Sequence, residues 1–240
     1  MVVRRRIGRP RANPRPAIGD PSDEILAVAS RLFGRAGVGS TTMSQIATEA
    51  GLKQSSLYYY FGSKEEVLAA IVARANVVPL EWLDAIEREG GLPAVQLYRF
   101  VRGDVMALCA LPFDINEVHR VAARDRRQFD RYWKERRALQ RRIASIVTEG
   151  TRGGALRDVP ADLTALTVMS NDEAVQNWYR LDRRAVKDPR DVGTFVADLT
   201  VGGLLASSSR LPGVRRKADQ ADFRGSIERI RPVQSRETHR

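Results

Sequence analysis

The chain has 240 residues, of which 43% are hydrophobic and 29% are charged, and its formal net charge is +11. No uncharged apolar run approaches the ~18 residues that cross a bilayer, which excludes a membrane-spanning protein. A single cysteine, Cys109, excludes an internal disulfide framework and a cysteine-rich zinc site. The basic N-terminus lacks the apolar segment of a secretory signal. We therefore expect a soluble, cytoplasmic protein that does not act at membranes.

The positive charge lies at the two ends of the chain. Residues 1–20 hold six Arg and one Asp, and residues 210–240 hold nine Lys or Arg against four acidic residues, so each end contributes +5. Basic ends on a nearly neutral body favour a polyanionic partner, nucleic acid first, although solubilising tails are the alternative. Because Pro and Gly punctuate both ends and large apolar residues are scarce, we expect both to be disordered.

Between the ends, apolar residues recur with a helical period and no stretch alternates as a strand does, which predicts an all-α fold. A first helix should begin near Ser22 and end before Gly37. Thr42 and the Gln three residues later match a capping box, which starts a short helix over 43–50. A third helix is expected over 54–61. Longer helices are expected over 64–75, 79–89, 93–110, 114–122, 125–150, 161–181 and 190–208.

Two short helices behind a longer amphipathic one have the composition of a helix-turn-helix, whose second helix enters the DNA major groove. On the 54–61 helix, Leu57 and Phe61 should point inward, which puts Ser55 and Tyr59 on the opposite face. Small hydroxyl residues leave room for a DNA backbone and offer donors to phosphates and bases. The alternative is that the tyrosines pack against the next domain. The flanking residues are Ser56, Tyr58 and Tyr60.

The segment TTMSQIATEAGLKQSSLYYYFGSKEEVL closely resembles the DNA-binding signature of the tetracycline-repressor (TetR) family of bacterial transcriptional regulators. The resemblance covers about residues 22–68. It implies a DNA-binding domain over 21–64 and a larger effector-binding and dimerisation domain over 65–209. The implied DNA contacts are Thr42 and Tyr58 at phosphates, Gln54, Ser55 and Tyr59 at base edges or mixed positions, and Tyr60 and Lys64 at the backbone. Lys53 and Ser56 complete the predicted DNA-binding set. Ser55 stands where such proteins often have Gly, which leaves the base preference open.

Residues 21–64 hold only four basic and three acidic residues, too few for the ~6–10 phosphate contacts of a tight site. The N-terminal arm can supply more. Arg6, Arg9 and Arg11 belong to a Gly-Arg-Pro segment that resembles an AT-hook core, which lies in a narrow A·T minor groove. A merely electrostatic tail is the alternative.

In the TetR family, the remaining helices include a two-fold dimer interface. Here the 161–181 and 190–208 helices each carry a stripe along one side. Its residues are Leu163, Leu166, Ser170, Ala174 and Trp178, then Phe195, Val196, Leu199, Gly202 and Ala206. Two adjacent glycines, Gly202 and Gly203, suggest a close helix–helix approach. We expect a four-helix dimer interface, and hence a palindromic operator, with an intramolecular core as the alternative.

For an effector the sequence offers large apolar side chains that are equally typical of core. These candidates are Trp82, Tyr98, Phe100, Met106, Phe113, Phe129, Trp133, Met169 and Trp178. The segment 120–142 holds ten basic and three acidic residues. It is either a solvated helix face or the site of an anionic effector, such as a carboxylate or a CoA-linked lipid. Residues 113–181 also resemble, loosely, actinobacterial repressors of lipid and sterol breakdown. The 64–75 helix is the expected transmitter to the DNA-binding domain, through Val67, Leu68, Ile71 and Val72.

Sequence motifs of enzymes are missing. We find no phosphate loop, no nucleophile elbow and no zinc-protease motif, and the only histidines are His119 and His239. We expect no catalytic residue, metal or cofactor. The predicted function is a ligand-responsive repressor that binds double-stranded DNA as a homodimer. The alternative is an architectural DNA-binding protein without an effector, and a metabolite-dependent operator affinity separates the two.

Overall fold

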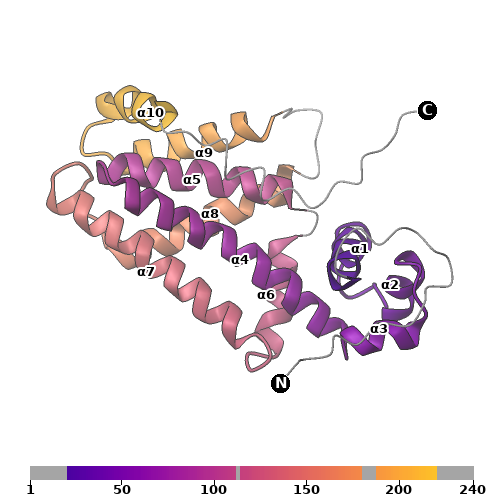
Figure 1. Cartoon of the computed structure of the whole chain (residues 1–240). Helices are drawn as coiled ribbons and strands as arrows, with labels where there is room; N and C mark the ends of the chain where they lie inside the picture. The colour runs from indigo at the N-terminus through magenta and orange to yellow at the C-terminus, as the bar shows by residue number, and fades with distance from the viewer. Residues whose placement is uncertain (1–20, 112–113, 180–187, 221–240) are drawn as a thin grey trace, which may run out of the picture.

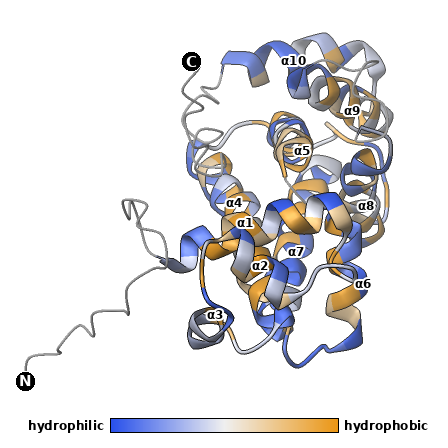
Figure 2. Cartoon of the chain, turned by 90° about the vertical axis from the view of Figure 1, so that its right-hand side faces the viewer, coloured by the Kyte–Doolittle hydropathy of each residue, from blue (hydrophilic) through white to orange (hydrophobic). Residues whose placement is uncertain are grey.

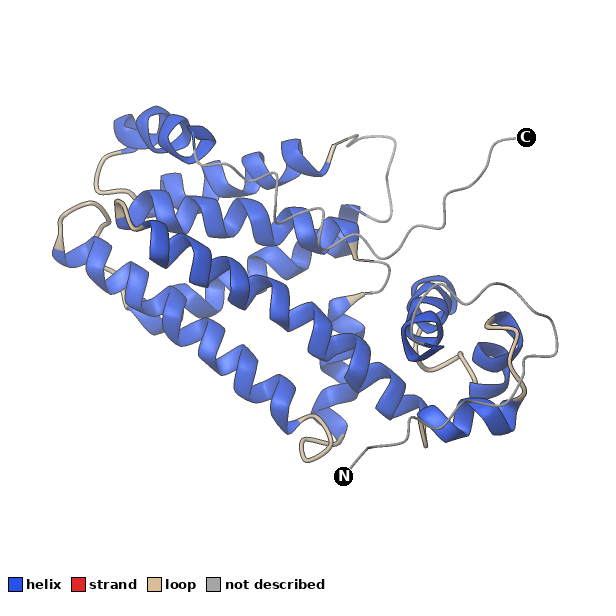
Figure 3. Cartoon of the chain, in the orientation of Figure 1, coloured by secondary structure: helices blue, strands red, loops and turns tan. Residues whose placement is uncertain are grey.

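The computed structural model describes residues 21–111, 114–179 and 188–220, and these residues contain helices and no strand (Figures 1 and 3). The predicted all-α fold is confirmed. The helices are α1 Pro21–Ala36, α2 Met43–Glu49, α3 Gln54–Tyr60, α4 Lys64–Glu89, α5 Pro93–Ala110, α6 Ile115–Arg124, α7 Asp130–Arg152, α8 Ala161–Tyr179, α9 Pro189–Leu204, the 3-10 turn η1 Ser208–Arg210 and α10 Leu211–Gln220.

Helices α1 to α3 form a small unit at one end of the molecule, and α4 leads from it into the larger helical body (Figure 1). Two hydrophobic clusters follow this division. The first, which we call the reading-head cluster, joins α1, α2, α3 and the start of α4 to α6 and the start of α7. The second fills the body between α4, α5, α7, α8, α9 and α10.

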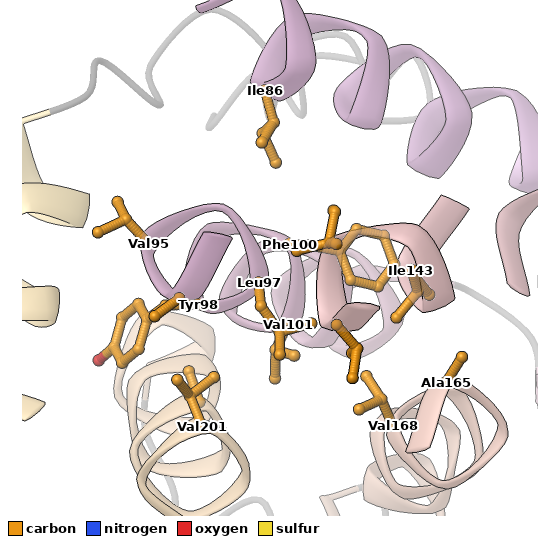
Figure 4. Packing of buried hydrophobic residues seen from close by; sticks show 14 of the residues in the cluster. Ile86, Val95, Leu97, Tyr98, Phe100, Val101, Ile143, Ala165, Val168 and Val201 are labelled. Atoms are coloured by element: carbon orange, nitrogen blue, oxygen red, sulfur yellow. The ribbon is translucent and has the colours of Figure 1, made fainter. Parts of the chain in front are cut away.

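Helix α5 is the centre of the body, and Figure 2 looks nearly along its axis. It contacts α4, α7, α8, α9 and α10. Such a helix, buried all round, belongs to the interior of a domain. Figure 4 shows Leu97 and Val101 of α5 between Ile86 of α4, Val168 of α8 and Val201 of α9.

Helix α4 contradicts the expected break at Pro79. The sequence predicted separate helices over 64–75 and 79–89, whereas one helix runs from Lys64 to Glu89 with Pro79 inside it. A proline removes one backbone hydrogen bond and crowds the preceding turn. Leu83 and Ile86, just beyond the proline, are fully buried in the body, and such packing can outweigh a local helix breaker.

Helix α10 corrects the expected C-terminal tail. Residues 210–240 were predicted to be disordered, but Leu211–Gln220 form a helix whose Val214 and Ala218 are buried. The guanidinium of Arg102 on α5 fixes this helix, because it pairs with Asp219 and donates to the carbonyl of Ala218 at 3.0 Å. Two buried apolar residues four apart and the Arg102 contacts together hold this basic segment against the body. Residues 221–240 and 1–20 lie outside the described residues.

Helices α5 and α9 approach each other closely at Gly193. A Cβ atom on Gly193 of α9 would lie 2.5 Å from the carbonyl oxygen of Arg102 on α5. Within the chain, Gly203 meets nothing within 4 Å, and Gly202 meets only Leu211. The tight approach predicted at Gly202 and Gly203 belongs to the expected dimer interface, which a single chain does not test, so it stays a prediction.

We expect Gly193→Ala to lower the free energy of unfolding by about 1–3 kcal/mol, because the added methyl forces α5 and α9 apart. Gly213→Ala in α10 is the matched control, since its Cβ position is open. The control should change stability by no more than about 1 kcal/mol, in the stabilising direction. Urea denaturation of both variants measures the difference, and equal stabilities would contradict the crossing.

Candidate DNA-binding surface and effector domain

Both ends of α2 are built as the sequence predicts. The backbone N–H of Gln45 donates to Thr42 Oγ1 at 3.2 Å, and the backbone N–H of Thr42 donates to Gln45 Oε1 at 2.8 Å. This reciprocal pair is a capping box. At the other end of α2, Gly51 has φ 66°, a left-handed conformation that glycine adopts without strain. The backbone therefore sets the angle at which α3 leaves α2.

Helix α3 presents a polar and aromatic face to solvent. Leu57 is fully buried in the reading-head cluster, while Tyr59 on the opposite side is 73% exposed. Lys53, Gln54, Ser55 and Tyr58 are also exposed, and so is Thr42 at the start of α2. Ser56 and Tyr60 are half-buried. The predicted orientation of α3 is thus present.

Tyr60 differs from its two neighbours. Its side chain packs against the reading-head cluster, and its ring stands edge-on to that of Tyr59, with centroids 5.3 Å apart. The alternative that the tyrosines pack inward therefore holds for Tyr60 but not for Tyr58 or Tyr59. Tyr60 supports Tyr59 from behind, which limits the orientations that the exposed ring can adopt.

Lys64 has a role that the sequence did not reveal. Its ammonium donates to the backbone carbonyls of Val38, Gly39 and Thr41, at 2.7, 3.1 and 2.9 Å. An ammonium group has three N–H donors, so in this arrangement none remains for a phosphate. This brace between α4 and the α1–α2 turn uses the donors that the expected DNA contact of Lys64 would need, and that contact stays a prediction.

Lys64→Met should lower the stability of the DNA-binding unit by about 1–3 kcal/mol, because hydrogen bonds from a charged donor are lost. If Lys64 instead neutralised a phosphate, the variant would keep its stability, and the slope of log K against log[salt] would fall by about 0.9. Urea denaturation and a salt titration of DNA binding separate these outcomes.

Helix α6 joins the DNA-binding unit to the body. The Glu117 carboxylate accepts a hydrogen bond from the backbone N–H of Val38 at 2.6 Å. In the same contact, Gly37 has φ 81°, and a Cβ atom there would lie 3.1 Å from the Glu117 carboxylate. The expected transmitter residues Val67, Leu68, Ile71 and Val72 lie in the reading-head cluster together with Ile115 and Val118 of α6. These α4 residues therefore share one core with α6, while α4 packs directly on α5 and α7 of the larger domain.

Most of the predicted effector residues lie in the hydrophobic core. The core side chains among them are Trp82, Tyr98, Phe100, Met106, Phe129 and Met169, all buried. Trp133 is half-buried, and its indole N–H donates to the carbonyl of Ala122 at 3.2 Å. Trp178 is 42% exposed on α8. Phe113 lies outside the described residues, as do Arg6, Arg9 and Arg11 of the arm. Aromatic residues at helical spacing thus mark the core here.

The basic segment 120–142 is only partly a solvated face. Arg136 forms a bidentate pair with Glu173 of α8, and Arg142 pairs with Asp84 and Glu87 of α4. Other arginines of the segment are exposed, among them Arg126, Arg127, Arg137 and Arg141. Arg136 and Arg142 therefore hold α7 to α8 and α4. Because both guanidinium groups are already paired with carboxylates, they are poorly placed to bind an anionic ligand.

A buried polar cluster, which the sequence reasoning missed, lies where α5, α7 and α8 meet. We call it the carboxyl cluster, and it consists of Asp104, Asp172 and Glu173. All three are at most 8% exposed. Burial, and the charge of Glu173 nearby, raise the pKa of Asp104 to about 7, although Arg136 opposes this shift. Burial also raises the pKa of Asp172 well above its usual range, and the negative charges of Asp104 and Glu173 raise it further. In the sequence, the signal that could have revealed this cluster was the presence of acidic residues on otherwise apolar faces of α5 and α8.

Burial shifts the pKa of two side chains that could in principle act as nucleophile or base. Burial raises the pKa of the Cys109 thiol to about 12. Burial and Arg136 lower the pKa of His119 to about 3, so its imidazole is neutral at pH 7. No group of three His, Cys, Asp or Glu among the described residues is arranged to hold a metal ion. Nor is any described helix long and apolar enough to span a membrane.

Helices α8 and α9 share an apolar outer face, which we call the α8–α9 face. Its large members, Leu163, Leu166, Trp178, Phe195 and Leu199, are between 42% and 63% exposed. Asn171 of α8 donates to Thr200 Oγ1 of α9 at 3.2 Å, which ties the two helices side by side. Val196, which the sequence assigned to this face, is buried in the core instead. Large apolar side chains exposed together on two neighbouring helices are typical of an interaction surface.

Comparison with known proteins agrees with this arrangement. Residues 25–71 match the family "Bacterial regulatory proteins, tetR family", and residues 115–204 match "Tetracyclin repressor-like, C-terminal domain". The chain is 26% identical over 167 residues to the HTH-type transcriptional repressor KstR2 of Mycobacterium tuberculosis, covering 65% of this chain and 80% of that protein.

Solved structures show the same fold. The ketosteroid transcriptional regulator KstR2 of M. tuberculosis has a TM-score of 0.66 at 20% identity, over 79% of this chain and 97% of that one. AmtR of Mycobacterium smegmatis has a TM-score of 0.66 at 26% identity, over 88% and 99%. AibR, solved with isovaleryl coenzyme A and operator DNA, has a TM-score of 0.64 at 16% identity, over 78% and 100%. The helix-turn-helix, the helical body and these matches together place the chain in the TetR family of bacterial transcriptional regulators.

Proposed function

We propose that this protein is a homodimeric transcriptional repressor that binds a palindromic operator through α3 and is released from it by a small-molecule effector. The exposed Ser55 and Tyr59 face of α3, on a helix anchored by the buried Leu57, carries the proposal. A rigid helix with exposed hydroxyl and aromatic groups suits contacts with base edges and phosphates. The repressor relatives of the chain support the same reading.

The α8–α9 face supports the dimer. Its leucines and aromatic residues lie on two neighbouring helices, and a second copy would cover them with the same patch in a four-helix packing. A two-fold dimer presents two copies of α3, and these read two half-sites of opposite direction. The proposed cellular location is the cytoplasm, where the DNA is, and we propose no enzymatic activity.

Release by an effector follows from population shift. A ligand of the body releases DNA only if it prefers a conformation in which the two α3 helices no longer match successive major grooves. The Glu117–Val38 hydrogen bond and the shared reading-head cluster connect the body directly to the α1–α2 turn. An architectural protein without an effector would have no use for this connection.

The test of this proposal is a metabolite screen against the operator complex, followed by two titrations. An effector found by release should lower operator affinity, and operator DNA should weaken effector binding by the same factor, typically ~5–150-fold. Calorimetry with and without operator measures the second factor. A tight ligand whose affinity is identical in both titrations would favour the architectural alternative.

A further inference from the structure

We propose that the carboxyl cluster of Asp104, Asp172 and Glu173 binds the positively charged nitrogen of an organic-cation effector. The inference rests on the proposed function, and it names the chemical class of the effector and the place where its polar end binds. Each step follows from contacts inside the body.

The cluster has more acceptors than the protein satisfies. Arg136 is the half-buried cation beside it, and its guanidinium forms the bidentate pair with Glu173. Asp172 is 0% exposed, and neither of its carboxylate oxygens has a hydrogen-bond partner among the described residues. Native proteins rarely leave such groups unpaired, because an unpaired buried acceptor costs about 1–3 kcal/mol. A ligand that brings donors would remove this cost.

The net negative charge of the carboxyl cluster determines which ligand charge it favours. Three carboxyl groups face one guanidinium, so a ligand carboxylate would add repulsion, whereas an ammonium would neutralise the excess. Burial also raises the pKa of Asp104 and of Asp172 when no ligand is bound, as expected for carboxyl groups that lack a cation. An anionic group, such as that of a CoA thioester, fits only outside this cluster.

Aromatic rings border the cluster on the side of α6 and α7. His119 Nδ1 lies 3.7 Å from Glu173 Oε2, and the His119 ring is 5.8 Å from that of Tyr132 and 6.3 Å from that of Trp133. Aromatic faces attract organic cations. On α5 and α8, Val105, Val168 and Met169 lie beside the two aspartates and are buried. The surroundings therefore suit a cation with an apolar body.

Binding at this place would act on the DNA-binding unit through α6. His119, at the cluster, and Glu117, which accepts from Val38 N, are two residues apart on the same helix. The start of α6 is held by Gln176, which accepts from Ile115 N at 2.7 Å and donates to the carbonyl of Leu108 at 2.7 Å. A ligand at the carboxyl cluster would lie beside His119 and so act on α6, whose Glu117 is bonded to the α1–α2 turn.

The experiment uses the full-length protein and three probes of equal chain length, octylamine, 1-octanol and octanoate. Binding is measured by calorimetry and by thermal shift, and operator release is measured in parallel. We expect octylamine to bind at least 10-fold more tightly than octanoate, with 1-octanol between them. Asp172→Asn should weaken octylamine binding at least 10-fold and leave 1-octanol within 3-fold. Asp162→Asn, an exposed acid at the start of the same helix, is the matched control and should change neither.

Several results would overturn the inference. They are equal affinity for octylamine and octanoate, no binding of any probe, or equal behaviour of the Asp172 and Asp162 variants. Asp172→Asn should fold at least as stably as the wild type, since it removes an unpaired buried carboxyl, so its unfolding would assign Asp172 a structural role instead. Amine-selective binding without any specific operator would defeat the proposed function alone. A specific operator with no amine selectivity would defeat this inference alone.

Discussion

Tyr59→Ala is expected to weaken binding to the selected operator by about 1–3 kcal/mol, or roughly 5–150-fold, while leaving the fold intact. The side chain is 73% exposed on the outer face of α3, so its removal opens no cavity. Fluorescence anisotropy with labelled operator measures the affinity, and circular dichroism measures the fold. Tyr59→Phe separates the contribution of the hydroxyl from that of the ring.

Non-specific DNA is the control for the Tyr59 variants. Because affinity for it comes from phosphate contacts, both variants should bind it as the wild type does. Leu57→Ala, on the inner face of the same helix, should instead destabilise the protein by about 2–5 kcal/mol. Wild-type operator affinity for Tyr59→Ala would show that α3 does not read the operator.

Phe195→Asp on the α8–α9 face should convert the dimer to monomers and abolish tight operator binding. Phe195 is 59% exposed in the single chain. Burying a Phe side chain stabilises by about 1.5–3 kcal/mol, and a two-fold interface contains the residue twice. The dimer dissociation constant should therefore rise by about 100-fold or more. Analytical ultracentrifugation measures it, and the operator complex should weaken in parallel.

Leu92→Asp is the matched control for the dimer variant. Leu92 is 52% exposed in the turn between α4 and α5 and is not a member of the α8–α9 face. It should leave the dimer and the operator affinity unchanged. A dimeric Phe195→Asp protein, or a Leu92→Asp protein that dissociates equally, would mean that the copies associate through another surface.

Local signals made the DNA-binding unit predictable. A capping box, a left-handed glycine and one buried leucine act within a few residues, so the sequence alone oriented α3. Lys64 could not be placed in this way, because its three acceptors lie about twenty-five residues earlier in the chain and meet it only in the folded protein. A lysine near a helix-turn-helix suggests a phosphate contact whether or not its donors are already used.

The body was predicted less well because tertiary packing overrides local preference. Pro79 lies inside a continuous helix, and the basic segment at Leu211 folds, since each is held by buried neighbours. Apolar side chains look alike in sequence whether they line a pocket or a core, so the sequence alone did not assign Trp82 and Phe100 to the core, where they are buried. The informative residues were the opposite kind, such as Asp104 and Asp172, whose charge contradicts the apolar faces around them.

Selecting genomic fragments with the full-length protein, and sequencing the fragments that it retains, tests whether a two-fold dimer reads DNA through α3. The account predicts one enriched motif, an inverted repeat whose half-sites are centred about one helical turn apart, ~34–36 Å, or a multiple of it. Enrichment of A·T-rich DNA without a repeat, or of no sequence at all, would contradict it.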